Sequence, residues 1–177
     1  LIESLIADEF DITSCQEMLV DHAFAIPMNL MWPNMEPKPV RSIPVLVNGI
    51  QHPLPSPSRC FKFGRALGRA IESYPEDLKV LVVGTGGMSH QLDGTRAGFI
   101  NKDFDRMCLE KLVDDPKALT RYSIREIAEL AGAQGVEIIM WLIARAALTG
   151  HVSKVHSQYR VPVSNTATGL LVLENAA

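Results

Sequence analysis

The chain has 177 residues, of which 47% are hydrophobic and 21% are charged, and its net charge at pH 7 is −3. This length and composition suit one domain of ordinary size with a substantial hydrophobic core. The slightly acidic balance gives no argument for binding to nucleic acid or to an anionic membrane surface, and no apolar run reaches the roughly 18 residues that a membrane-spanning helix needs.

The cysteines and the first residues bear on the protein's setting. Cys15, Cys60 and Cys108 are far apart and lack CxxC spacing, so we expect reduced thiols in a cytoplasmic protein, with neither a disulfide framework nor a zinc site. The chain begins with LIESLIADEFD, without Met and already within an apolar pattern. The chain therefore looks like a piece of a longer protein.

The first half of the chain predicts helices and strands in alternation. Ser14-x-x-Glu17 has the pattern of a capping box, which predicts a helix that carries His22 and that Pro27 should end or kink. The elements expected next are a buried strand over 42–49, a helix over 58–73 and a strand over 79–83.

The second half continues the alternation. Apolar residues at helical spacing from Phe104 to Leu112 predict a helix, and the capping box Ser123-x-x-Glu126 predicts another. The remaining elements expected are a helix over 134–149 that Gly150 ends, a strand over 159–164 and a helix over 168–175. This order predicts an α/β fold, a layered domain with a mostly parallel sheet flanked by helices. Ligand sites in such sheets lie beyond the carboxyl ends of the strands, where His90 and Ser164 fall.

The stretch VLVVGTGGMSH places a histidine just after a glycine turn. GTGG is not the GxGxxG of dinucleotide-binding folds and no GK[ST] follows, so a phosphate-binding loop is not indicated. The glycines indicate either a plain turn or a close approach of the backbone to a ligand. Histidine as a residue type ordinarily exchanges protons near neutral pH and so suits acid–base chemistry; a structural loop histidine is the alternative at position 90.

Glu137 is an acidic residue within the apolar run GVEIIMWLIARAAL. On a helix its same-face neighbours are Trp141 and Ala144, and a carboxylate on such a face is costly unless it is paired or binds a metal. The alternative is that Glu137 reaches solvent or Arg145. Sequence alone leaves both interpretations open.

The other polar candidates have ordinary explanations. His22 suits a hydrogen-bonded core histidine, His52 a loop residue, and His151 and His156 exposed residues, none with the spacing of metal ligands. The hydroxyl-rich stretch SNTATG (164–169) either orients a polar group of a substrate or caps the following helix.

Four long stretches, taken together, resemble one enzyme family. They are SCQEMLVDHAFAIPM, VVGTGGMSHQLDGTRAGFINKDFD, GAQGVEIIMWLIARAAL and YRVPVSNTATGLLVLE. They resemble the class III (LigB-type) extradiol ring-cleaving dioxygenases, and within that family most of all the β subunits of protocatechuate 4,5-dioxygenases and the gallate dioxygenases. The resemblance extends over nearly the whole chain.

The resemblance implies a chemistry and a set of site residues. It implies Fe(II)-dependent meta cleavage of a carboxylated catechol such as protocatechuate or gallate, with both atoms of O2 incorporated. By the same resemblance, His90 is the acid–base catalyst, His22 a second active-site histidine, and Glu137 the carboxylate ligand of iron. Ser164 and Asn165 match residues near the substrate carboxylate. The implied partners are a catecholic substrate, O2, and either a second copy of the chain, a small α subunit or a fused C-terminal domain.

The chain departs from the family in one respect. The family's two histidine ligands of iron lie in its N-terminal part, and this sequence has no histidine before His22. By the resemblance, residues 1–177 are then the C-terminal part of a single LigB-like catalytic domain that is N-terminally incomplete. We therefore expect this chain alone to bind iron weakly or not at all and to be inactive, and the full-length protein to be the enzyme. The alternative function is that of a non-catalytic relative or subunit of the same fold with a role in binding or assembly.

Overall fold

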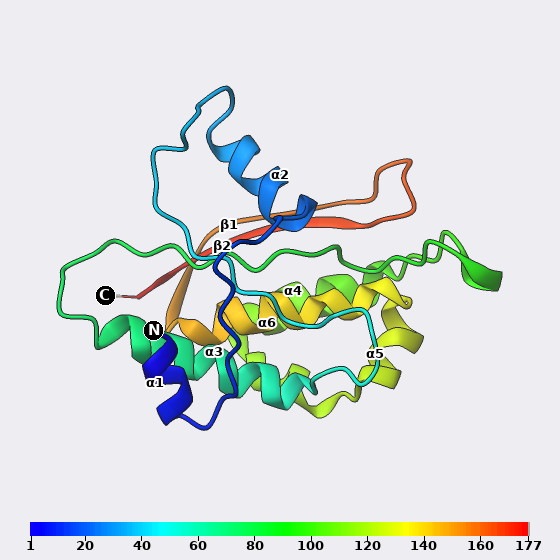
Figure 1. Ribbon diagram of the computed structural model, residues 1–177. Coiled ribbons are helices and arrows are strands. Elements are labelled where there is room, and N and C mark those ends of the chain that lie inside the picture. Colours follow the sequence, from blue (N-terminus) through cyan, green and yellow to red (C-terminus); the bar gives the residue numbers. More distant parts are fainter. Residues whose placement is uncertain (177) are drawn as a thin grey trace.

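The computed structural model describes residues 1–176, in which helices cover one face of a two-stranded antiparallel hairpin (Figure 1). The α-helices are α1 (Ile2–Ala7), α2 (His22–Met31), α3 (Pro57–Glu72), α4 (Lys102–Asp114), α5 (Ile124–Ala131) and α6 (Ile138–Ala147). Short 3-10 helices are η1 (Gly94–Arg96), η2 (Pro116–Arg121) and η3 (Gln134–Glu137), and the strands are β1 (Val152–Arg160) and β2 (Thr168–Asn175). Helices α3 to α6 lie on one side of the hairpin and α2 lies on the other (Figure 1).

The core is built around α6, whose side chains Ile139 and Leu142 are almost completely buried. Helix α3 packs closely along α6 because Gly64 and Gly68 face it without side chains. A Cβ on Gly64 would collide with the carbonyl oxygen of Ile143, and one on Gly68 with that of Ala147. The two glycines therefore set how near the two helices can lie.

Local signals at the helix starts explain where several helices begin. The Ser123 side chain accepts a hydrogen bond from the Glu126 backbone N–H, and the Glu126 carboxylate accepts one from the Ser123 backbone N–H, so the predicted capping box is confirmed. Ser56 caps α3 by accepting from Arg59 N at 3.2 Å, with Pro57 at the first helical position. The helices predicted from the apolar periods over 58–73 and 104–112 are confirmed as α3 and α4.

The first predicted helix begins later than expected. Residues 14–17 form no helix; α2 begins at His22, where the Asp21 side chain accepts a hydrogen bond from Ala23 N at 2.9 Å. Pro27 lies inside α2 and does not end it. A competing cap therefore decides the start of this helix, because Asp21 satisfies a free backbone N–H directly.

The described residues combine helices with a sheet, as the α/β prediction requires, but the mostly parallel sheet is not seen in them, because their two strands pair antiparallel. Segments 42–49 and 79–83 are extended but pair with no strand within residues 1–176. Side chains of these segments are exposed, including Ile43 and Leu46 at 73% each and Leu81 at 67%. Extended backbone becomes a strand only where a neighbour supplies hydrogen bonds, and the described residues supply none here.

The sheet is instead formed at the C-terminal end of the chain. β1 runs from Val152 to Arg160 rather than over 159–164, and residues 168–175, expected to be a helix, form β2. The two strands pair antiparallel from Val152↔Asn175 to Arg160↔Thr168, with a register irregularity between Lys154 and His156. Exposed and partly buried residues alternate along β2, as expected for a strand that has one face covered.

The helix expected over 134–149 is confirmed in its main part. Its first turn is the 3-10 helix η3, and α6 ends at Ala147 before Gly150. Within residues 1–176, none of the helices combines the length and apolar composition needed to cross a bilayer.

Candidate active site

The loop that carries His90 passes between the hairpin and α6. Met88 N donates to Ala167 O at 3.0 Å, and Ala167 N donates to Ser89 O at 3.1 Å. His90 N donates to Ala131 O at 2.8 Å. The loop is therefore held at its backbone by the start of β2 and by the end of α5, and the His90 residue is only 5% exposed.

The hydrogen bond of the His90 ring selects its tautomer. Nδ1 lies 2.8 Å from the carbonyl oxygen of Met88. A carbonyl oxygen only accepts, so Nδ1 carries the hydrogen of the neutral ring and Nε2 keeps a free lone pair. Nε2 in turn lies 4.0 Å from Oε2 of Glu137. This leaves the ring with one nitrogen able to take a proton.

Glu137 stands at the junction of η3 and α6, where it faces the glycine loop. Its Oε2 accepts a hydrogen bond from Gly87 N at 2.7 Å, and its side chain is 31% exposed. It forms no bond with Arg145, whose Nε donates instead to Leu112 O at 2.7 Å. Its partial exposure and its bond with Gly87 agree with a carboxylate that reaches solvent without Arg145. The other interpretation, a metal ligand, stays a prediction.

The glycines permit the loop to approach Glu137 and His90. Gly86 has a φ of 139°, and a Cβ there would lie 2.6 Å from the Cβ of Glu137. A Cβ on Gly87 would lie 2.7 Å from Cε1 of His90. Trp141 Nε1 also donates to Gly86 O at 3.1 Å. Only residues without side chains allow this contact, so the turn is more than a chain reversal.

The connection between β1 and β2 brings a third segment to this place. Thr166 forms an isolated antiparallel bridge with His90, and its Cγ2 lies 2.9 Å from where a Cβ on Gly87 would be. Asn165 Oδ1 lies 3.5 Å from where a Cβ on Gly98 would be, and Ser164 is exposed. Ser164 and Asn165 thus lie in the segment that pairs with the histidine loop. Sequence reasoning did not single out Thr166, although the hydroxyl-rich stretch was the available signal.

His22 is not joined to this cluster by a polar contact. It is the first residue of α2 and is exposed, so the interpretation as a buried core histidine is wrong. Among residues 1–176, no hydrogen bond or ion pair connects it with His90 or Glu137. His52, His151 and His156 are exposed, as expected.

Sequence reasoning also missed a buried polar network behind the loop. Asp105, only 1% exposed, accepts hydrogen bonds from Ser89 N at 2.8 Å, Ser89 Oγ at 2.6 Å and the Tyr159 hydroxyl at 2.7 Å. Burial is the main cause that raises the pKa of Tyr159, and the hydrogen bond to Asp105 adds to it. In the sequence, Asp105 is one of several charged residues on the predicted helix, so its spacing alone did not indicate a buried polar network.

The cysteines take no part in the site. Cys60 and Cys108 are buried thiols, and Cys15 is exposed. Burial raises the pKa of Cys60 to about 11. Burial and, secondly, the charge of Asp105 raise the pKa of Cys108 to about 12. Both thiols therefore stay protonated at neutral pH. A cysteine that binds a metal does so as the deprotonated thiolate, so neither thiol is suited to that role.

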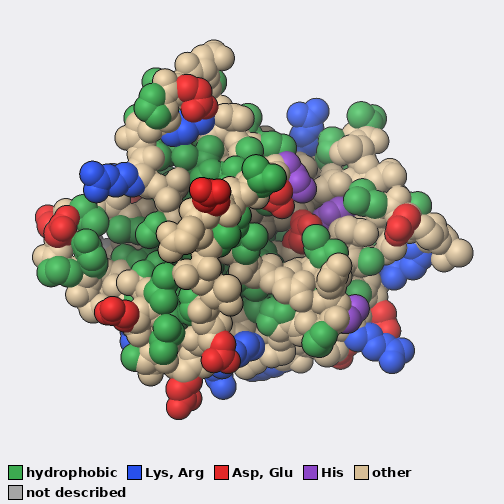
Figure 2. Space-filling view, viewed as in Figure 1, with side chains coloured by type: hydrophobic (Ala, Val, Ile, Leu, Met, Phe, Trp, Pro, Cys, Tyr) green, Lys and Arg blue, Asp and Glu red, His purple; other side chains and the backbone are tan. Residues whose placement is uncertain are grey.

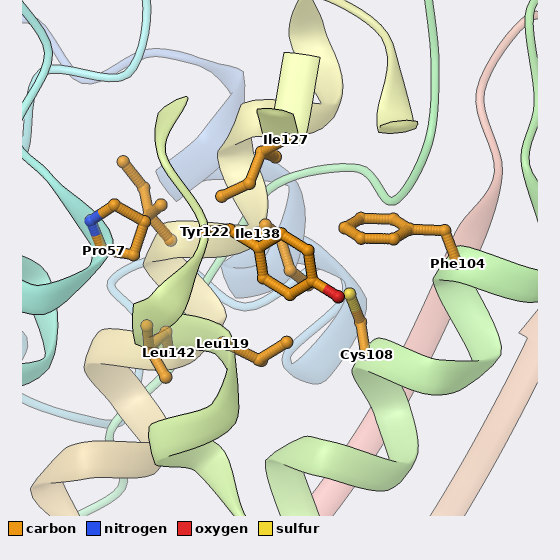
Figure 3. A pocket seen from close by; sticks show the side chains of 9 residues that line it. Pro57, Phe104, Cys108, Leu119, Tyr122, Ile127, Ile138 and Leu142 are labelled. Atoms are coloured by element: carbon orange, nitrogen blue, oxygen red, sulfur yellow. The ribbon is translucent and has the colours of Figure 1, made fainter. Parts of the chain in front are cut away.

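Two cavities of the described residues lie away from the candidate site. Figure 3 shows a small apolar cavity of about 10 Å³, which Phe104 and Cys108 of α4 and Tyr122 line together with side chains of α5 and α6. A second cavity of about 430 Å³ adjoins Arg65, Arg145 and His151, at the other end of α6 from Glu137. In the candidate site the Glu137 side chain is 31% exposed, whereas the His90 residue is 5% exposed. On the face of the molecule drawn in Figure 2, histidine and acidic side chains lie near one another.

The metal-binding capacity of this arrangement is incomplete. Glu137 offers one carboxylate, of which only Oε2 accepts a hydrogen bond. Within residues 1–176, no group of three or more His, Cys, Asp and Glu side chains could hold a metal ion. The donors therefore fit one ligand of a site with two histidines and a carboxylate, and they do not make that site by themselves.

Comparison with known proteins decides the family. A family model described as the catalytic LigB subunit of aromatic ring-opening dioxygenase matches residues 1–170. The chain belongs to the LigB family.

Two curated proteins similar to this LigB chain are dioxygenases by name. A gallate dioxygenase of Pseudomonas putida is 47% identical over 173 residues, which are 98% of this chain and 51% of the relative. A 2,3-dihydroxyphenylpropionate/2,3-dihydroxicinnamic acid 1,2-dioxygenase of Photorhabdus laumondii is 36% identical over 90 residues, 51% of this chain and 27% of the relative. The chain thus spans about half the length of the gallate dioxygenase.

Proposed function

We propose that this chain is the C-terminal part of the catalytic domain of an extradiol dioxygenase. The full-length protein opens the ring of a carboxylated catechol, gallate or protocatechuate, next to the two hydroxyl-bearing carbons rather than between them. Both atoms of one O2 molecule enter the product. The name of the Pseudomonas putida relative, which matches 98% of this chain, supports gallate in particular.

One observation carries the proposal. The only nitrogen of the His90 ring that is free to accept a proton faces the Glu137 carboxylate at 4.0 Å, in a loop that two glycines bring against α6. A structural loop histidine would need no such arrangement. The pairing of a base with a carboxylate at a partly exposed place is typical of a catalytic site.

His90 moves protons in the proposed reaction. Its Nε2 takes a proton from a phenolic hydroxyl of the catechol and later returns one to the product. Because Nδ1–H is held by the Met88 carbonyl, the ring cannot turn its protonated nitrogen toward the substrate. A protonated ring would lie beside the Glu137 carboxylate, and opposite charges at this separation attract.

Fe(II) is the cofactor that we propose, with Glu137 as its carboxylate ligand. The two histidine ligands would come from polypeptide outside the described residues, since these contain no complete metal site. When bound, iron supplies the redox chemistry that joins O2 to the catechol. The residues of this chain bind, orient and exchange protons with the substrate.

Ser164 and Asn165 are proposed to orient the carboxylate of the substrate, and His22 to lie near the substrate. The support for Ser164 and Asn165 is their place in the segment whose Thr166 pairs with His90. An exposed hydroxyl and an amide can donate hydrogen bonds to a carboxylate. His22 rests on the family resemblance alone.

Further polypeptide is proposed to complete the domain. The exposed apolar side chains of segments 42–49 and 79–83 support this, because such segments are normally covered in a folded protein. The partners proposed are a second copy of the chain, or a small α subunit or a fused C-terminal domain that covers the site. The 177 residues alone are proposed to bind iron weakly or not at all and to be inactive.

The test uses the full-length protein loaded with Fe(II) under anaerobic conditions. Gallate and protocatechuate are added in turn, O2 is admitted, and oxygen uptake is followed with the yellow ring-opened product. Glu137→Ala should abolish uptake, and His90→Ala should lower kcat by about 10²- to 10⁴-fold. His156→Ala, an exposed histidine on β1, is the control and should retain activity.

The alternative function is a non-catalytic LigB relative with a role in binding or assembly. A folded, iron-loaded protein that consumes no O2 with any catechol would favour it. A tight, stoichiometric iron site in the 177-residue chain alone would contradict the proposal that the other ligands lie elsewhere.

A further inference from the structure

Asp105 is a buried carboxylate that the proposed chemistry does not use. It lies in the first turn of α4 and is 1% exposed. No ion pair involves it among residues 1–176, so no cation compensates its charge there. Burying a charge is costly unless hydrogen bonds satisfy it.

Three donors converge on the Asp105 carboxylate. Oδ1 accepts from Ser89 N, and Oδ2 accepts from both the Ser89 hydroxyl and the Tyr159 hydroxyl, at 2.6 to 2.8 Å. Short hydrogen bonds to an ionised oxygen are among the stronger ones. The N-terminal end of a helix also favours a negative charge, as at this first turn of α4. Both oxygens of the Asp105 carboxylate are therefore hydrogen-bonded.

Ser89 is the residue through which the network reaches the site. It directly precedes His90, and both its backbone N–H and its hydroxyl are bound to Asp105. Its hydroxyl also accepts from Asn101 N at 2.8 Å. Tyr159 ties the same carboxylate to β1. Asp105 therefore joins α4, the histidine loop and the hairpin.

Other contacts of the loop do not duplicate this role. The backbone of Met88, Ser89 and His90 is also bound to Ala167 and Ala131. These bonds tie the loop to the hairpin and to α5, but they do not tie it to α4. The ring contact of His90 with Met88 O lies within the loop, so it moves with the loop and cannot locate it. Asp105 is the side chain that ties the loop to α4 through two bonds at one residue.

We propose that Asp105 is a positioning residue for His90: by holding Ser89 and Tyr159, it keeps His90 Nε2 facing Glu137. The proposal rests on the acid–base function proposed for His90. A displacement of about 1 Å at a catalytic group can lower a rate by about 10²-fold. Loss of the Asp105 network should therefore slow turnover without weakening substrate binding to a similar degree.

The test compares Asp105→Asn, Ser89→Ala and Tyr159→Phe with Asp103→Asn in the full-length, Fe(II)-loaded protein. Asp103 lies in the same helical turn but is exposed, so it is a matched control. We expect Asp105→Asn to lower kcat per iron-loaded site by about 10- to 100-fold with KM for gallate changed less than about threefold. Tyr159→Phe, which keeps the ring, should lower kcat by a smaller factor, and Asp103→Asn should not change it.

The double variant Ser89→Ala with Asp105→Asn separates positioning from general stability. Because both changes disrupt one network, the loss in the double variant should be clearly smaller than the product of the two single losses. Full kcat in Asp105→Asn and Tyr159→Phe, or equal effects of Asp105→Asn and Asp103→Asn, would overturn the proposal. A fall in the rate per protein molecule that disappears when the rate is expressed per bound iron would overturn it too.

Amide hydrogen exchange tests the positioning claim without turnover. The Ser89 amide should exchange faster in Asp105→Asn and be unchanged in Asp103→Asn. If the wild-type protein opens no catechol, the proposed function fails, while this exchange result still decides whether Asp105 holds the loop. Unchanged exchange at Ser89 in Asp105→Asn would refute the role.

Discussion

Replacing Gly86 with alanine should destabilise the protein strongly, because this position has two independent reasons to be glycine. Its φ of 139° is a backbone conformation that L side chains rarely adopt. A Cβ would also lie 2.6 Å from the Cβ of Glu137 and 3.1 Å from its Oε2. Backbone strain costs about 1–3 kcal/mol, and overpacking adds about 1–3 kcal/mol.

The two contributions together predict a loss of roughly 2–6 kcal/mol in the free energy of unfolding. That is a large part of the about 5–15 kcal/mol that stabilises a typical domain. Gly94→Ala is the matched control, because its φ of 73° is also positive but a Cβ there would meet nothing within 4 Å. It should lose only about 1–2 kcal/mol from the backbone.

Urea unfolding of the full-length variants, followed by circular dichroism, measures both losses. The free energy of unfolding of Gly86→Ala should be lower than that of Gly94→Ala by at least about 1 kcal/mol. A Gly86→Ala protein as stable as Gly94→Ala would show that the loop relaxes away from Glu137. The close approach of the glycine loop to α6 would then not be a constraint on the fold.

Three further predictions follow from packing and burial. Gly64→Ala should lower the free energy of unfolding by about 1–3 kcal/mol despite the better helix propensity of alanine, since its Cβ would meet the Ile143 carbonyl; an unchanged melting temperature would contradict this. In the native protein a thiol reagent should modify the exposed Cys15 quickly, and Cys60 and Cys108 only after unfolding; rapid labelling of three thiols in the folded state would disprove it. The pKa of Cys108 in the folded protein is raised to about 12. The stability that its neutral thiol contributes is therefore fully present below the ordinary thiol pKa, and it is lost as the pH rises above about 9, where the thiol of the unfolded chain ionises. The melting temperature should accordingly fall at alkaline pH, and Cys108→Ala should reduce this fall.

Much of the helical part of the fold could be predicted from the sequence. The Ser123 capping box and the apolar period from Phe104 to Leu112 are local signals, and α4 and α5 follow them. The strands could not be predicted in this way. Segments 42–49 and 79–83 have the composition of buried strands, but a strand also needs a partner, which pattern alone does not identify.

The C-terminal hairpin shows the opposite error. TGLLVLEN reads equally well as a short helix or a strand, and pairing with β1 decides for the strand. The Ser14 capping box failed because Asp21, seven residues later, caps the helix that forms.

The sequence pointed to site residues where a polar side chain occurs in an unusual setting. Glu137 in an apolar run and His90 after a glycine turn were both conspicuous, and the structure brings them within 4.0 Å. Asp105 and Thr166 were not, because their importance comes from contacts with distant residues such as Tyr159. Long-range polar networks leave no periodic trace in a sequence.

The unpaired extended segments have a consequence for handling the protein. Backbone groups along 42–49 and 79–83 find no strand partner within residues 1–176, and Ile43, Leu46 and Leu81 are exposed beside them. Such edges are templates for pairing with another chain. When these 177 residues are produced alone, self-association through these edges is the expected behaviour, and an oligomer seen then would report exposed edges rather than the natural assembly.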